Sequence, residues 1–298
     1  MKILVLGSNG VVGNGISQAF KNHKIIKVNS NSYNYNSDKY KLSMFAKCDY
    51  FIHAAGITEE EIANHGSNKS LKRANIASTR LLNHIVNLGC KNIIYISTLR
   101  LYSEKAKNLN EEKTRLNIND SYKSGHWKTE NVFKKISEKY KIKHLILRPG
   151  AVYGFPSKTN NFNRLKLIPY SFPISLYLNN KIILKSSGIQ MRNFCSNKDI
   201  GVRVFNWIKN KNKTNILSNI SGDKTCSVKD FSYICIKIFK KIFKKKASVD
   251  IHFNSRKRKK LIVKQNIKIK NKNKVEKFLK EFFLLLKKNK IIQQNLNN

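Results

Sequence analysis

The stretch that decides the fold is residues 2–20, KILVLGSNGVVGNGISQAF. After its first residue, the segment Lys2–Leu6 is wholly apolar, which is typical of a buried parallel strand. Three glycines, Gly7, Gly10 and Gly13, follow at regular intervals, and a helix is expected next. This order predicts a dinucleotide-binding βαβ unit. The first glycine permits a tight turn, the second lets the backbone approach a pyrophosphate, and the third lets helix and strand pack closely.

The helix after the loop offers its free N–H groups and the positive end of its dipole to phosphates. We therefore predict cofactor contacts at the three glycines and at Asn9, Val11 and Val12 between them. The second predicted strand ends in Asn29 and Ser30. An acidic residue there would bind the ribose of NAD, and an arginine would accommodate the extra phosphate of NADP. Neither is present, so the choice between NAD and NADP stays open at this point.

The rest of the first half alternates apolar runs with amphipathic stretches. The further predicted strands are Lys24–Val28, Asp49–Ala54, Asn92–Thr98 and Lys143–Leu147. The further predicted helices are Leu71–Leu88 and Tyr122–Tyr140. Strands and helices that alternate at this spacing indicate an α/β fold with a Rossmann-like, doubly wound parallel sheet.

After Gly154 the alternation loosens and prolines gather. Two later helices are predicted, Ser227–Phe243 and Lys274–Lys288. We expect residues 1–154 to form the dinucleotide-binding domain. Residues 155–298 are expected to form a smaller, mixed, mainly substrate-binding region, with a segment at about residues 192–222 returning to the main sheet.

The chain has 298 residues and a formal net charge of +42, from 59 Lys and Arg against 17 Asp and Glu. Such an excess suits nucleic acid or an anionic membrane surface. A compositional bias accounts for it as well, because Lys, Asn and Ile are abundant together, so we expect no specific nucleic acid. The cysteines are odd in number, show no metal-like spacing and follow no export signal, which predicts reduced thiols in the cytoplasm and no metal site. No apolar stretch is long enough for a membrane span.

Five further segments show the order and spacing of motifs of one known family. They are Asp49–Gly56, Arg73–Ile76, Ile96–Tyr102, Leu147–Gly154 and Gly188–Phe194 followed by Asp199. Together with the glycine loop they resemble the extended short-chain dehydrogenase/reductase family, the nucleotide-sugar epimerases and dehydratases, over about residues 1–290. The resemblance implies a nucleotide-sugar substrate, hydride transfer with NAD or NADP, a slight preference for NAD, and a homodimer.

The same resemblance assigns roles to single residues. Thr98, four residues before Tyr102, matches the catalytic Ser/Thr that hydrogen-bonds the reacting oxygen of the substrate. Tyr122 matches the tyrosine that takes or returns the proton of the sugar hydroxyl. Arg192 matches the arginine that grips the diphosphate of a nucleotide sugar. Further cofactor contacts are expected from Ala54, Ala55, Gly56, Asn75, Tyr122, His126 and Pro149.

The family motif is Tyr-x-x-x-Lys, in which the lysine lowers the pKa of the tyrosine and bonds the nicotinamide ribose. This chain has His126 instead, four residues after Tyr122 and on the same face of the predicted helix. An imidazole is mostly neutral at pH 7. Three outcomes stay open: a partly charged His126 that works at a reduced rate, a cation supplied by another element, or nucleotide binding without redox catalysis.

We therefore predict an NAD(P)-dependent epimerase, dehydratase or reductase with Thr98, Tyr122 and His126 as catalytic residues. The alternative from another class is a non-catalytic dinucleotide-binding protein, a sensor or partner-binding module that kept the fold. A third interpretation, association with RNA or membranes, rests on the net charge alone. Ala151 stands where epimerases commonly carry an asparagine that touches the substrate, which leaves the sugar open. The nucleotide and the type of reaction are open as well.

Overall fold

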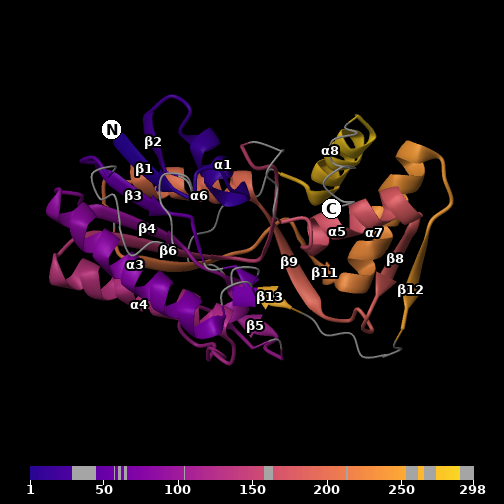
Figure 1. Cartoon of the computed structure of the whole chain (residues 1–298), viewed down its shortest axis with the longest axis horizontal. Helices are drawn as coiled ribbons and strands as arrows, with labels where there is room; N and C mark the ends of the chain where they lie inside the picture. Colours follow the sequence, from indigo (N-terminus) through magenta and orange to yellow (C-terminus); the bar gives the residue numbers. More distant parts are fainter. Residues whose placement is uncertain are drawn as a thin grey trace.

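A computed structural model gives the arrangement of the chain (Figure 1). The residues it describes are 1–28, 45–56, 58–59, 62–63, 66–103, 105–157, 164–212, 214–252, 261–264 and 273–288. They form a large lobe around a central sheet and a smaller lobe built mainly from helices (Figure 1).

Within the described residues, six strands form the central sheet. They are β1 (Lys2–Leu6), β2 (Lys24–Val28), β3 (Tyr50–His53), β4 (Asn92–Ile96), β6 (Lys143–Pro149) and β10 (Ile216–Ile220). Their order across the sheet is β10-β6-β4-β3-β1-β2, and all neighbours are parallel. The predicted α/β class with a Rossmann-like parallel sheet is confirmed. The strand order reverses between β1 and β3, and ligands of such sheets bind at this switch point, outside the carboxyl ends of the strands.

Helices cover both faces of this sheet (Figure 1). Those on one face are α1 (Val11–Ala19) and α6 (Asn197–Lys209), and those on the other are α3 (Ser67–Asn87) and α4 (Ser121–Lys139). The sequence of β1 explains this arrangement. Ile3 and Val5 pack in the core beneath α1 and α6, whereas Leu4 and Leu6 pack in the core beneath α3 and α4. A strand buried on both faces needs such an unbroken apolar run.

Helices α1 and α6 approach each other through glycines. A Cβ atom added to Gly15 would lie 2.3 Å from the Asn197 carbonyl oxygen, and one added to Gly201 would lie 2.4 Å from the Gly15 carbonyl oxygen. The Asn197 side chain also donates a hydrogen bond to the Val11 carbonyl (2.7 Å). Because α1 begins at the end of the glycine loop, this contact fixes the position of that loop.

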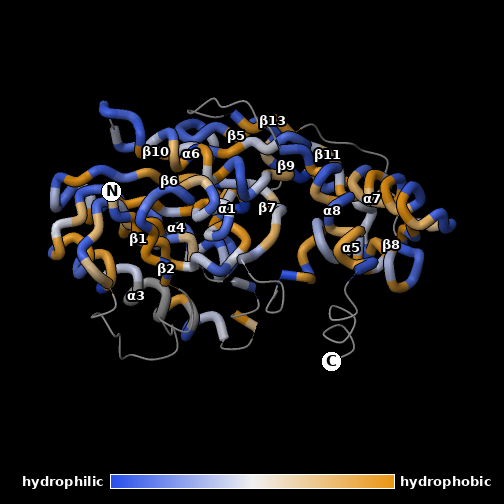
Figure 2. The backbone as a smooth tube through the Cα atoms, turned by 90° about the horizontal axis from the view of Figure 1, so that it is seen from above, coloured by the Kyte–Doolittle hydropathy of each residue, from blue (hydrophilic) through white to orange (hydrophobic). Residues whose placement is uncertain are grey.

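The smaller lobe contains α5 (Ile168–Asn179), α7 (Val228–Phe243), α8 (Val275–Lys288) and the strand pair β8 (Lys181–Leu184) and β12 (Ser248–Ile251). A three-stranded sheet leads into it, with β9 (Met191–Ser196) between β7 (Ala151–Tyr153) and β11 (Lys224–Ser227). Aromatic side chains dominate its core, among them Phe231, Phe239 and Phe282. Figure 2 shows apolar residues gathered in both lobes. The remaining short elements are η2 (Leu99–Leu101), β5 (Asn108–Leu109) and β13 (Ile262–Val263).

Several element boundaries differ from the prediction by one to four residues, among them the start of α3 and the end of β4. Helix α3 begins at Ser67, four residues before the predicted start. The prediction missed its first turn because that turn is polar and carries no apolar pattern. The strand predicted up to Thr98 ends at Ile96, because Thr98 caps η2 with its side chain. The division of the chain at residue 154 stays a prediction. Of the helices described, none has the length and apolar character to cross a membrane.

Candidate active site

The glycine loop between β1 and α1 is shaped by its first and third glycines. Gly7 has a φ of +82°, a conformation that strains any side chain. A Cβ atom on Gly13 would lie 2.1 Å from the Gly7 carbonyl oxygen, inside the turn. A Cβ atom on Gly10 would meet only that same oxygen, at 3.4 Å. Gly7 and Gly13 are therefore needed by the loop itself, whereas the space beside Gly10 is open to a ligand.

The N-terminus of α1 is free to receive an anion. Gly10 caps the helix without a side-chain hydrogen bond, and within the described residues no side chain accepts from the first helical N–H groups, those of residues 11–13. Asn9 is held in place by Ser157, whose N–H donates to the Asn9 carbonyl (3.2 Å) and whose hydroxyl donates to Asn9 Oδ1 (3.3 Å). The loop thus combines fixed backbone with unsatisfied donors.

A second loop, Ala54-Ala55-Gly56, follows β3 at the switch point and touches the first. A Cβ atom on Gly7 would lie 2.8 Å from the Ala55 nitrogen. At the other end of this loop, a Cβ atom on Gly56 would lie 2.9 Å from Cε1 of His126. Small residues are required at both points. The contact connects the glycine loop with α4.

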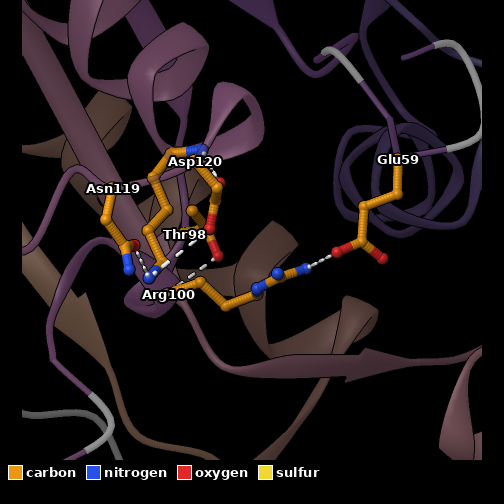
Figure 3. A network of polar contacts seen from close by, with 6 residues as sticks. Glu59, Thr98, Arg100, Asn119 and Asp120 are labelled. Atoms are coloured by element: carbon orange, nitrogen blue, oxygen red, sulfur yellow. Dashed lines mark hydrogen bonds and ion pairs between the residues drawn. The ribbon is translucent and has the colours of Figure 1, made fainter. Parts of the chain in front are cut away.

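Thr98 and Tyr122 come from two elements that meet at the same edge of the sheet. Thr98 follows β4 and is 6% exposed, and its Oγ1 accepts a hydrogen bond from the Arg100 N–H (3.2 Å). Tyr122 lies in the first turn of α4, which Asp120 caps by accepting from the Lys123 N–H (2.7 Å). The Arg100 guanidinium lies over the Tyr122 ring, with its carbon 4.5 Å from the ring centre. Figure 3 shows Arg100 extending from η2 beside Thr98.

His126 faces Tyr122 one helical turn away, with 4.6 Å between the ring centres. Its ring is buried, and Nδ1 lies 2.7 Å from the Tyr95 hydroxyl. Burial lowers the pKa of His126 to about 3, and the positive charges of Arg164 and Arg100 contribute to this shift. The protein therefore holds this imidazole neutral, which argues against a partly charged His126.

A sequence model of the NAD dependent epimerase/dehydratase family matches residues 3–218. The chain belongs to this family. No curated protein matches the sequence significantly.

Solved structures of epimerases and dehydratases share the fold of this family member at low sequence identity. UDP-glucuronic acid 4-epimerase from Bacillus cereus, in complex with UDP-glucuronic acid and NAD, is 17% identical with a TM-score of 0.78, over 97% of this chain and 99% of that chain. UDP-glucose 4-epimerase from Thermotoga maritima, with UDP-glucose, is 18% identical with a TM-score of 0.75, over the same shares. An NAD-dependent NDP-hexosamine 5,6-dehydratase of tunicamycin biosynthesis is 13% identical with a TM-score of 0.75, again over 97% and 99%.

The structure describes the remaining positions singled out in the sequence of this epimerase/dehydratase chain to different extents. Pro149 is buried at the end of β6. Arg192 is half-buried in β9 and donates to a main-chain carbonyl of its own strand (3.1 Å). Asn75 lies within α3, but its side chain is outside the described part of the structure. Asn29 and Ser30 also lie outside the described residues.

Arg100 is a residue that the sequence interpretation missed. A signal was present, because Arg100 comes two residues after Thr98 in the same motif. Its direction does not follow from the sequence, because the predicted strand ends at Thr98 and no helix is predicted at Leu99–Leu101, where η2 turns the Arg100 side chain toward Tyr122. Arg100 also forms an exposed ion pair with Glu59 (2.5 Å; Figure 3).

A buried ion pair holds α4 against the sheet. Arg148 of β6 donates two hydrogen bonds to the carboxylate of Glu130 of α4 (2.8 and 2.6 Å), and both side chains are at most 3% exposed. Arg148 also donates to the Tyr102 hydroxyl (2.8 Å). Two elements of the site, α4 and the segment after β4, are thereby tied to one strand. Among the described residues, no group of His, Cys, Asp or Glu is arranged to hold a metal ion.

Proposed function

We propose that this chain is an NAD(P)-dependent epimerase, dehydratase or reductase that acts on a nucleotide-activated sugar. The observation that carries this proposal is the meeting of three parts at one edge of the parallel sheet: the glycine loop, Thr98 and the Tyr122 face of α4. Support for the substrate class comes from the structures of the same fold whose complexes contain UDP-sugars and NAD.

The residues around the glycine loop fit a dinucleotide. The open space at Gly10 and the uncapped N–H groups of residues 11–13 suit a pyrophosphate, and the small loop Ala54-Ala55-Gly56 leaves room beside it. The chemistry that NAD supplies when bound is reversible hydride transfer. We propose NAD as the preferred cofactor, with further contacts from Asn9, Asn75 and Pro149.

Tyr122 and Thr98 have different roles: Tyr122 transfers the proton, and Thr98 hydrogen-bonds the reacting oxygen. The Tyr122 hydroxyl takes the proton of the sugar hydroxyl as the carbonyl forms and returns it in the reverse step. Thr98 Oγ1 already accepts a hydrogen bond from the Arg100 backbone, so its own hydrogen is left to donate to the reacting sugar oxygen. His126, neutral and beneath Gly56, offers a hydrogen bond toward the cofactor side of the site.

Arg192 is proposed to bind the diphosphate of the nucleotide sugar, because a guanidinium matches phosphate oxygens in charge and geometry. We also propose a cytoplasmic location and a homodimer.

The test has two stages. Isothermal titration of the full chain with NAD and with NADP is expected to show binding of at least one. The cofactor-loaded chain is then screened with UDP-glucose, UDP-glucuronic acid and UDP-N-acetylglucosamine, with thermal stabilisation and NMR of the product as measurements. Failure of both cofactors to bind at millimolar concentration would overturn the proposal.

A second candidate function is favoured by one observation: the position of the family lysine holds a histidine that the fold keeps neutral. This candidate is a non-catalytic dinucleotide-binding protein, a sensor or partner-binding module. It predicts cofactor binding without conversion of any nucleotide sugar. Product formation that depends on Tyr122 excludes it.

A further inference from the structure

A tyrosine that gives up its proton in catalysis needs a positive charge close to it, because that charge favours the phenolate. The residue four positions after Tyr122 does not carry one. His126 is buried, its Nδ1 is within 2.7 Å of the Tyr95 hydroxyl, and its Cε1 edge lies under Gly56. Any positive charge that the protein itself supplies at Tyr122 therefore comes from a residue other than His126.

Arg100 approaches Tyr122 from outside α4. Its guanidinium carbon is 4.5 Å from the centre of the Tyr122 ring, within the range of a cation–π contact. The backbone of the same residue donates to Thr98 Oγ1, so the cation and the Thr98 hydroxyl are fixed by one short helix, η2. Glu59 pairs with Arg100, but the two side chains are 48% and 60% exposed, so solvent weakens that pairing.

Two other cations of the region, Lys123 and Arg148, are paired with residues other than Tyr122. Lys123 Nζ donates to Asn119 Oδ1 (2.7 Å) and lies 3.5 Å from Asp120 Oδ2. Arg148 is bound to Glu130 in the core. The charged and titratable groups around Tyr122 and its immediate neighbours come from several elements and are Glu59, Arg100, Asp120, Lys123, His126 and Arg164. Among the described residues, Arg100 is the one whose cationic group lies over the Tyr122 ring.

We propose that Arg100 is the positioning residue that supplies the positive charge at Tyr122, and that His126 keeps only the neutral, hydrogen-bonding part of the lysine's role. This rests on the proposed function of Tyr122. The two duties that one lysine performs in the family motif are thus divided between η2 and α4. No oxidant or further reactant is required, because Arg100 acts only on the charge left when the proton moves from Tyr122.

The direct test follows the ionisation of Tyr122 in the full chain and needs no turnover. Ultraviolet difference titration of tyrosinate is compared between each protein and the same protein carrying Tyr122→Phe, which subtracts the other tyrosines. With Arg100→Met, the Tyr122 titration is expected to move to higher pH, because the phenolate loses its nearby cation. Arg100→Lys is expected to restore most of the shift, because it retains the charge.

Two control variants separate charge from structure. Glu59→Gln removes the anionic partner but keeps the cation, so the midpoint is expected to fall or stay the same. Arg80→Met, at an exposed position of α3, is expected to change nothing. An unchanged midpoint in Arg100→Met, or an equal rise in Arg100→Lys and Arg100→Met, would overturn the proposal.

The activity measurement separates this proposal from the proposed function. If a nucleotide sugar is turned over, the acid limb of the pH profile of kcat/KM is expected to move to higher pH in Arg100→Met, while NAD affinity changes less than about two-fold. If no nucleotide sugar is turned over but the tyrosinate midpoint still depends on Arg100, the proposed function fails and the role of Arg100 stands.

Discussion

The glycine loop and the Tyr122 corner (Thr98, Arg100, Tyr122 and His126) lie at the same edge of the sheet but are determined in different ways. The loop is set by backbone sterics, because a Cβ atom on Gly7 would meet the Ala55 backbone and one on Gly13 would meet the Gly7 carbonyl. The corner is assembled from side chains of separate elements, so one changed residue can be compensated from another element. A departure from the family motif can therefore be compensated in the corner but not in the loop.

Removal of the Tyr122 hydroxyl tests the corner most strongly. Tyr122→Phe is expected to lower kcat by about 10²–10⁴-fold, the usual contribution of a general base, without changing NAD affinity. Steady-state kinetics and titration calorimetry measure the two effects. Tyr140→Phe, at the other end of α4, removes a hydroxyl that bonds Asn83 (3.1 Å) and is the matched control with unchanged kcat. Equal turnover in Tyr122→Phe and the wild type would rule out Tyr122 as the base.

A methyl group added to the glycine loop tests whether backbone sterics determine the shape of the loop. Gly13→Ala places a Cβ atom 2.1 Å from the Gly7 carbonyl, so the turn must shift and the free energy of unfolding is expected to fall by about 3 kcal/mol. Gly10→Ala meets the same oxygen at 3.4 Å, so stability is expected to change by less than about 1 kcal/mol.

Urea unfolding and NAD titration of both variants separate packing from binding. Gly10→Ala is expected to lose NAD affinity by about ten-fold or more, because the methyl occupies the space proposed for the pyrophosphate. Equal stability of the two variants would contradict the steric account of the loop, and unchanged NAD affinity in Gly10→Ala would contradict the proposed position of the phosphates.

The fold could be predicted from local patterns. Strands β1, β2, β3, β4 and β6 of the main sheet each contain a short apolar run, and the glycines of the loop lie within seven residues of one another. Strand β10 (ILSNI) lacks such a run, and only a returning segment at about residues 192–222 was predicted there. The start of helix α3 could not be predicted in the same way, because its first turn, Ser67-Asn68-Lys69-Ser70, is polar. This turn extends a helix whose apolar pattern begins only at Leu71.

The corner could be predicted only in part. Thr98, Tyr122 and His126 follow from motif spacing, and the missing lysine is visible in the sequence. The sequence does not show that Tyr95, on the neighbouring strand β4, bonds the imidazole, or that η2 turns Arg100 over Tyr122. Both contacts join residues more than twenty positions apart, and both depend on side-chain directions that hydrophobic periodicity does not encode.

Acid should weaken the fold through the buried histidines. His53, at the end of β3, is 2% exposed, and neither ring nitrogen has a hydrogen-bond partner in the described part of the chain. Burial lowers its pKa to about 4. The unfolded chain therefore takes up the proton first, near pH 6.5. The contribution of His53 is complete above that pH and declines, by up to about 1.4 kcal/mol per pH unit, as the pH falls toward 4.

Urea unfolding between pH 7 and pH 4.5 (roughly the window set by these pKa values) measures this slope. His53→Phe fits among the rings of Phe51, Tyr95 and Phe133. It is expected to reduce the slope, with little change at pH 7, while the buried His126 and His144, whose pKa values are also lowered, keep the remainder. Replacement of the exposed His252 by Gln should leave the slope as it is. A wild-type slope in His53→Phe would mean that His53 does not carry the acid sensitivity.

The smallest effect is expected at His126 itself. If Arg100 supplies the charge, His126→Gln replaces one neutral hydrogen-bonding group with another, and kcat/KM should fall less than about ten-fold with an unchanged pH profile. The residual loss reflects the ring contacts with Tyr122 and Tyr95, which an amide cannot reproduce. A shifted acid limb in His126→Gln would show that the histidine is charged during turnover. In that case His126 would perform both duties of the family lysine, and Arg100 would lie next to Tyr122 without influence on its proton.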